Sequence, residues 1–164
     1  MKLKGTMRLV AVTISPVLFL FVTACAVNPV SGERQLMLLS EEQEHQLGRQ
    51  TDSQVVEQYG LYDDPALTKT LQERCNALGK VSHRPELDYK IKILDTPVVN
   101  AFAVPGGYIY FTRGILASLN SDAEMMGVLG HETGHITARH SAQQYTRAQI
   151  AQIGLGLGAV LSET

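Results

Sequence analysis

The chain has 164 residues, of which 45% are hydrophobic and 18% charged, and this ordinary balance excludes a largely disordered protein. Its formal charge is −2, and three of its 14 basic residues lie within the first eight positions, so the remainder sets 11 basic against 16 acidic side chains. This acidic remainder predicts no nucleic-acid partner.

The first 24 residues have the pattern of a bacterial export signal. Three basic residues precede an apolar run over residues 9–22, which is too short to be a convincing membrane span. The sequence V-T-A-C that ends at Cys25 resembles the lipobox of bacterial lipoproteins, which predicts cleavage before Cys25 and an acyl-chain anchor on that cysteine. Ala26 at the next position indicates the outer membrane. The alternative is a plain secretory signal followed by an ordinary cysteine.

Two helices are predicted after the leader. Residues 25–40 are interpreted as a lipidated tether, because they contain turn-forming dipeptides and no periodic pattern. A capping box at Ser40 then opens a mostly exposed helix that is expected to end near Gly60. The second helix is predicted from Asp64 to Gly79. Its apolar spacing places Cys75 on the buried face, where an unpaired thiol is tolerated.

Three short strands are predicted in the middle of the chain. Residues 87–93 alternate apolar and polar side chains with a period of two, as a half-buried strand does. Residues 98–104 and 108–112 read as two further strands that are joined by a tight turn at 105–107. With helices on either side of this small sheet in sequence, the expected fold class is α+β.

The last predicted helix is long. Ser121 and Glu124 form a second capping box pattern, and no proline interrupts the chain from there to its end. Gly127, Gly130 and Gly134 fall on one stripe of this helix although each glycine costs about 1 kcal/mol relative to alanine. Two explanations are open: close packing of the helix against a neighbouring strand, or room for a substrate and a metal.

The same helix carries H-E-x-x-H. On a helix, His131 and His135 stand one turn apart on one face, where two imidazoles can share one Zn²⁺. Glu132 lies about 100° further around the helix, where a general base can reach a metal-bound water. The three residues also occur together by chance, so the motif needs supporting context.

The context is a resemblance that extends over residues 28–150. N-A-F-A-V-P-G-G-Y-I-Y at 100–110, Arg113-Gly114 and G-H-E-T-G-H-I-T-A-R-H at 130–140 are similar to the zinc metallopeptidase family of the HtpX heat-shock protease and the CAAX prenyl protease. N-P-V-S-G at 28–32 and L-S-E-E-Q-E at 39–44 resemble the periplasmic lipoprotein, BepA-like, branch of that family.

The resemblance implies a zincin-like (gluzincin) domain with one Zn²⁺ per chain. It makes His131 and His135 zinc ligands and Glu132 the catalytic base. It also implies that the strand containing Asn100, Ala101, Phe102 and Ala103 is a sheet edge that pairs with an extended peptide substrate. The alternative for this strand is an ordinary core strand.

The sequence departs from the family pattern in the third zinc ligand. A catalytic zinc takes three protein ligands and a water, and the family's third ligand is a glutamate on a later helix. After His135, the metal-ligating side chains are His140, which a continuous helix would turn away from the metal, and Glu163, which lies next to the last residue. We therefore expect residues 41–164 to be the N-terminal part of a longer peptidase domain, with the third ligand beyond Thr164.

The functional hypothesis is a zinc metalloendopeptidase at the periplasmic face of the outer membrane. The resemblance implies that a zinc-bound water, activated by Glu132, hydrolyses misfolded or misassembled envelope proteins. The outer-membrane assembly machinery is the expected partner. The alternative hypothesis is a lipoprotein without catalytic activity that has a binding or chaperone-like role, or an inactive fragment.

Overall fold

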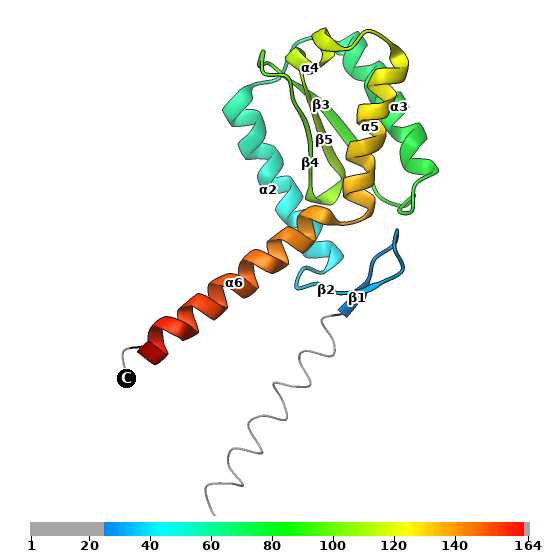
Figure 1. The fold of residues 1–164 in the computed structure, drawn as a ribbon. Helices are drawn as coiled ribbons and strands as arrows, with labels where there is room; N and C mark the ends of the chain where they lie inside the picture. Colours follow the sequence, from blue (N-terminus) through cyan, green and yellow to red (C-terminus); the bar gives the residue numbers. More distant parts are fainter. Residues whose placement is uncertain (1–24, 163–164) are drawn as a thin grey trace, which may run out of the picture.

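The structure is a computed structural model that describes residues 25–162 (Figure 1). The export signal predicted at 1–24 and the candidate ligand Glu163 lie outside these residues. The described residues form helices around one small three-stranded sheet, together with a two-stranded hairpin, so the α+β prediction is confirmed. No helix in the described part of the chain combines the length and the apolar character that crossing a membrane requires.

The three-stranded sheet has the order β3-β5-β4. β3 (Lys90–Leu94) runs parallel to β5 (Tyr108–Thr112), whereas β4 (Ala101–Val104) pairs with β5 in the antiparallel sense. The connection between β4 and β5 is the 3-10 turn η1 (Pro105–Gly107), in which Gly106 and Gly107 have φ angles of 78° and 94°. The left-handed region favours glycine, so the P-G-G sequence accounts for this turn.

The sheet lies between two layers of helices (Figure 1). Tyr108 and Tyr110 of β5 face Val55 of α2 (Glu41–Tyr59). The alternate side chains of β5 face α3 (Pro65–Lys80) and α5 (Asp122–Thr137), where they join the larger core cluster. Because β5 is central and covered on both faces, every one of its residues is buried.

The helices α2 and α3 begin where their caps predict. Ser40 and Gln43 form a complete capping box at α2, and the side chain of Asp64 accepts a hydrogen bond from the N–H of Leu67 at α3. The prediction for Cys75 is also confirmed: the thiol is free and fully buried. Burial raises the pKa of Cys75 to about 11, which leaves it protonated and unreactive at neutral pH.

The N-terminal segment is more ordered than a tether. β1 (Cys25–Val27) and β2 (Arg34–Leu36) form an antiparallel hairpin. Met37 and Leu39, which follow the hairpin, are buried against Ala142 of α6 (His140–Ser162). The tether predicted for residues 25–40 thus includes an ordered hairpin, and its apolar side chains pack on a residue that lies more than 100 positions later in the sequence.

The C-terminal helices differ most from the prediction. A short helix, α4 (Arg113–Ser118), precedes α5 and was not expected. Ser121 caps α5 as predicted, but the carboxylate of Glu124 accepts from the N–H of Asn120, so the second half of the capping box is displaced by one residue. The expected continuous helix is also wrong, because α5 ends at Thr137 and α6 starts after a break.

Candidate metal centre

The rotation of α5 about its axis is set by three apolar side chains. Met125, Leu129 and Ile136 belong to the main core cluster, and α5 packs against β4 and η1. Residues on the opposite side of the helix are therefore directed away from the core. His131 is exposed and His135 half-buried, so both imidazoles stay open to solvent while their backbone is held rigidly.

The structure brings the two predicted ligands together. The Nε2 atoms of His131 and His135 lie 3.0 Å apart, and the rings are nearly perpendicular, with centroids separated by 4.6 Å. Two nitrogens bound to one tetrahedral zinc at about 2.0 to 2.1 Å would stand about 3.3 Å apart. The pair therefore fits two positions of a zinc site after a small adjustment of the rings.

Glu132 lies on the buried side of α5. It is 7% exposed, and no hydrogen bond or ion pair among the described residues uses its carboxylate. Neither carboxylate oxygen is among the described buried polar atoms that lack a hydrogen-bond partner, so these oxygens reach solvent although the residue as a whole is largely buried. Two converging imidazoles beside a carboxylate that water can reach fit a metal site with an adjacent general base.

His140 does not point away from this site. Its Nδ1 atom lies 2.7 Å from Nδ1 of His135, on the other side of that ring from His131. The prediction failed because it assumed a continuous helix, whereas the chain turns at Arg139, the only described non-glycine residue with a positive φ angle, 56°. The turn brings His140, the first residue of α6, back to the end of α5.

His140 is nevertheless not a third ligand in this arrangement. The two nitrogens of one imidazole point in divergent directions, so His135 cannot direct both of them at one ion. In agreement, residues 25–162 contain no group of three or more His, Cys, Asp or Glu side chains placed to hold a metal ion. The described residues supply two converging nitrogens and one adjacent carboxylate.

The predicted substrate strand is the edge strand β4. In an antiparallel pair, alternate residues bond to the partner strand, and Asn100 occupies a bonded position because its carbonyl accepts from the N–H of Thr112. By the same alternation, the main-chain N–H and C=O groups of Phe102 face β5. Its ring stacks on that of Tyr110, with a centroid distance of 4.9 Å. The N–H and C=O groups of Ala101 and Ala103 therefore face outward from the sheet.

The glycine stripe of α5 lies open. A Cβ atom added at Gly127, Gly130 or Gly134 would meet no described atom within 4 Å. Close packing of the helix against a neighbouring strand is therefore excluded as the reason for the stripe in the described part of the chain. Gly48 of α2 is different, because a Cβ atom there would collide with the backbone of Pro105.

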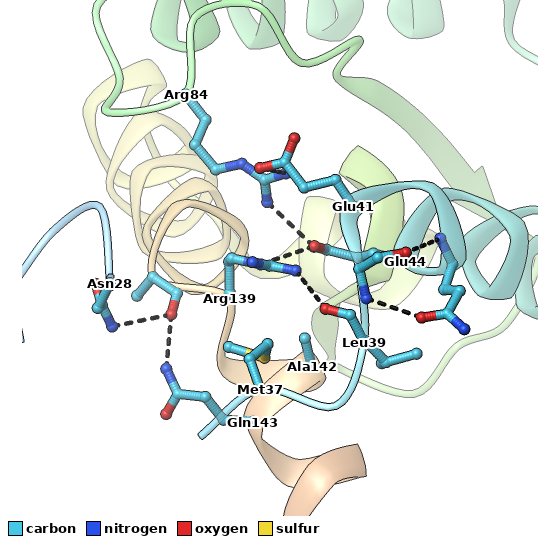
Figure 2. Close-up of polar contacts among 12 residues, drawn as sticks. Asn28, Met37, Leu39, Glu41, Glu44, Arg84, Arg139, Ala142 and Gln143 are labelled. Atoms are coloured by element: carbon cyan, nitrogen blue, oxygen red, sulfur yellow. Dashed lines mark hydrogen bonds and ion pairs between the residues drawn. The ribbon is translucent and has the colours of Figure 1, made fainter. Parts of the chain in front are cut away.

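A buried ion network that the sequence patterns did not reveal holds the turn after α5 (Figure 2). The carboxylate of Glu44 lies between two guanidinium groups, at 3.1 Å from Arg84 and 2.9 Å from Arg139, and all three side chains are buried. Arg139 also donates to the carbonyl of Leu39 at 3.1 Å. No sequence signal marks this network, because Arg84 and Arg139 both have mainly polar neighbours in the sequence and Glu44 lies in a polar helix.

Comparison with known proteins identifies the family. Residues 65–163 match the model described as Peptidase family M48. The chain is 34% identical over 97 residues to Mitochondrial metalloendopeptidase OMA1 of Arabidopsis thaliana, covering 59% of this chain and 20% of that protein. It is 30% identical over 125 residues to the protein of the same name in Schizosaccharomyces pombe, covering 73% and 37%.

A bacterial relative matches more of the chain. The Beta-barrel assembly-enhancing protease of Escherichia coli (strain K12) is 28% identical over 159 residues, which cover 92% of this chain and 32% of that protein. The chain thus spans between about a fifth and somewhat over a third of the length of these relatives. The match to the family model covers more than half of the chain and includes the H-E-x-x-H helix. The chain therefore belongs to peptidase family M48, a family of metalloendopeptidases.

Proposed function

We propose that this protein is a zinc metalloendopeptidase in which His131 and His135 bind the metal and Glu132 is the general base. The observation that supports this proposal is the 3.0 Å approach of two Nε2 atoms on the same helix turn as Glu132, whose carboxylate oxygens are accessible to water. A catalytic zinc takes three protein ligands, and the described residues supply two converging nitrogens toward that set.

The residues of the chain have distinct tasks in this mechanism. Zinc, when bound, lowers the pKa of a water molecule and polarises the scissile carbonyl. Glu132 accepts the proton of the attacking water and donates it to the leaving amine. Most of the Glu132 side chain is buried on α5, while its carboxylate oxygens stay accessible to a water molecule, as both transfers require.

The substrate in this proposal is an extended peptide that adds a strand to β4. The outward N–H and C=O groups of Ala101 and Ala103 offer two pairs of main-chain hydrogen bonds with the two-residue spacing of a strand. α5 packs against β4, so a peptide bound at this edge would run beside the motif helix. Main-chain pairing does not depend on side-chain identity, which suits an enzyme that acts on unfolded or misassembled proteins.

The cellular setting proposed is the periplasmic face of the outer membrane. Support comes from the lipobox-like sequence that ends at Cys25 and from a relative that is named a Beta-barrel assembly-enhancing protease. We propose lipidation of Cys25, misassembled envelope proteins as substrates and the outer-membrane assembly machinery as a partner. Mass spectrometry of the mature N-terminus tests this part, and an unmodified Cys25 would contradict the anchor.

A second candidate is a binding or chaperone-like lipoprotein without catalytic activity. The observation that favours it is that the described residues provide two converging nitrogens rather than three metal ligands. Peptide binding without hydrolysis, in a chain that holds no zinc, would identify this alternative.

The catalytic assignment is tested with two substitutions. Glu132→Gln should retain zinc and lose peptide hydrolysis, because the amide preserves shape but cannot accept the proton. His131→Ala should lose the metal itself. Zinc content is measured by atomic emission and hydrolysis with casein, and His83→Ala in an exposed loop is the control. Normal hydrolysis by Glu132→Gln would remove Glu132 from its proposed role.

A further inference from the structure

The second ring nitrogen of His135 also has a partner. If Nε2 of His135 faces the metal, Nδ1 must carry the ring's proton and needs an acceptor. The structure places Nδ1 of His140 at 2.7 Å from it, with the ring centroids 4.9 Å apart and the planes inclined by 65°. No other hydrogen bond to Nδ1 of His135 is found in the described part of the chain.

Two hydrogen bonds link the three imidazole rings, and their donors and acceptors can be assigned in two ways. In one, Nε2–H of His131 donates to Nε2 of His135, and Nδ1–H of His135 donates to Nδ1 of His140. In the other, both donors are reversed, and Nε2 of His135 carries a proton that would block a metal. In the first arrangement Nε2 of His135 carries no proton and accepts the hydrogen bond from His131, and only the Nε2 proton of His131 has to be lost when a metal binds both rings.

We propose that His140 is a positioning residue: it accepts the Nδ1 proton of His135 and so fixes the tautomer and the ring orientation that present Nε2 to the metal. The inference rests on the proposed function, because it assigns His135 as a ligand. Histidines that bind zinc usually donate their second N–H to an acceptor of this kind, and the loss of that acceptor weakens the metal site.

The position of His140 is determined by the chain rather than by packing of its own side chain, which is exposed. The residue before it, Arg139, has a φ angle of 56°, a conformation that is unfavourable for a non-glycine residue. Its buried pairing with Glu44 holds the guanidinium in place, and the backbone of Arg139 is thereby fixed in the turn.

The same turn is held from the N-terminal segment (Figure 2). The carbonyl of Ala138 accepts hydrogen bonds from the side-chain amides of Asn28, at 3.2 Å, and Gln143, at 2.8 Å. The N–H of Leu38 donates to the hydroxyl of Thr146 on α6 at 3.1 Å. These contacts fix the orientation of the first two turns of α6 and thereby hold His140 beside His135.

The test compares His140→Phe, which removes the acceptor at similar ring size, with His140→Gln, which restores an acceptor through its side-chain carbonyl. The control is His83→Phe. In the full chain, we expect the zinc dissociation constant, measured by competition with a chelator, to rise about 10- to 100-fold in His140→Phe. It should recover largely in His140→Gln and stay unchanged in the control. Unfolding midpoints should agree among all variants, because His140 is exposed.

A second readout does not require the metal. ¹⁵N chemical shifts of the imidazole nitrogens in the metal-free chain should show His135 protonated at Nδ1, and His140→Phe should remove this preference. Protonation of His135 at Nε2, or equal zinc affinity in His140→Phe and the original chain, would overturn the inference. A chain that binds no zinc but keeps the Nδ1 tautomer would contradict the proposed function and still support the hydrogen bond to His140.

Discussion

The two edge strands of the three-stranded sheet differ in whether their outward main-chain groups have hydrogen-bond partners. At the β3 edge, the side-chain amide of Gln72 on α3 accepts from the N–H of Ile91 at 3.0 Å and donates to the carbonyl of Tyr89 at 2.8 Å. The N–H of Tyr62 donates to the carbonyl of Ile93 at 2.9 Å, so this edge is closed by side-chain and loop groups.

At the β4 edge, by contrast, Ala101 and Ala103 turn main-chain groups outward, and the glycine stripe of α5 lies uncovered on the adjacent helix. An uncovered edge strand invites pairing with another chain, and proteins normally block it. Here the blocking groups are concentrated on β3. The difference supports the proposal that an incoming peptide strand pairs with the β4 edge.

The largest effect is expected from Ala103→Pro at the open edge. Proline removes the outward N–H, and its ring occupies the space in which a substrate carbonyl would lie. Loss of two or three main-chain hydrogen bonds at about 1 kcal/mol each should reduce kcat/KM for peptide cleavage by about 100-fold. Ala103→Ser, which retains the N–H, is the control, and unfolding curves check the fold. Unchanged cleavage by a folded Ala103→Pro would show that substrates do not pair with β4.

A smaller effect is expected at the closed edge. Gln72→Met keeps the side-chain volume but leaves the buried N–H of Ile91 without its acceptor, which should lower the free energy of unfolding by about 2 kcal/mol. Gln46→Met on the exposed side of α2 should change it by less than about 0.5 kcal/mol. Urea denaturation measures both. Cleavage by the folded Gln72→Met variant should stay normal, and reduced cleavage would contradict the assignment of separate roles to the two edges.

The smallest effect is expected at Gly127 on the uncovered stripe. Because a Cβ atom there meets nothing within 4 Å, Gly127→Ala should raise the free energy of unfolding by about 0.5 to 1 kcal/mol through helix propensity alone. Gly48→Ala, in a helix that contacts the Pro105 backbone, should lower it. A more stable Gly127→Ala that cleaves peptides slowly would favour the stripe as room for substrate, whereas a destabilised variant would mean that another segment covers α5.

Local signals predicted much of this fold. β5 occupies the predicted residues, and the caps at Ser40 and Asp64 mark the starts of α2 and α3. The one-turn spacing of His131 and His135 brings their rings together on α5, while their roles as ligands stay predictions. These features depend on contacts within a few residues, which is why the pattern of one segment was enough.

Features that depend on distant contacts were not predictable. The end of α5 is fixed by the pairing of Arg139 with Glu44, 95 residues earlier, and no local helix-breaking residue marks it. The position of His140 depends on that break, so the prediction for this residue was wrong. Gln72 reads as an ordinary polar helix residue until β3 is placed beside it. In each case the structure depends on a hydrogen bond or ion pair between a side chain and a distant residue. Sequence spacing does not identify that distant residue.

The pairing of Glu44 with Arg139 also limits how far the protein can be shortened from its N-terminus. The family match begins at residue 65, yet the carboxylate that holds the turn after the motif comes from a helix before that boundary. A recombinant fragment trimmed to 65–163 would retain H-E-x-x-H, but it would uncover the tyrosine face of the sheet and release the start of α6. The smallest competent unit is thus larger than the region by which its relatives are detected.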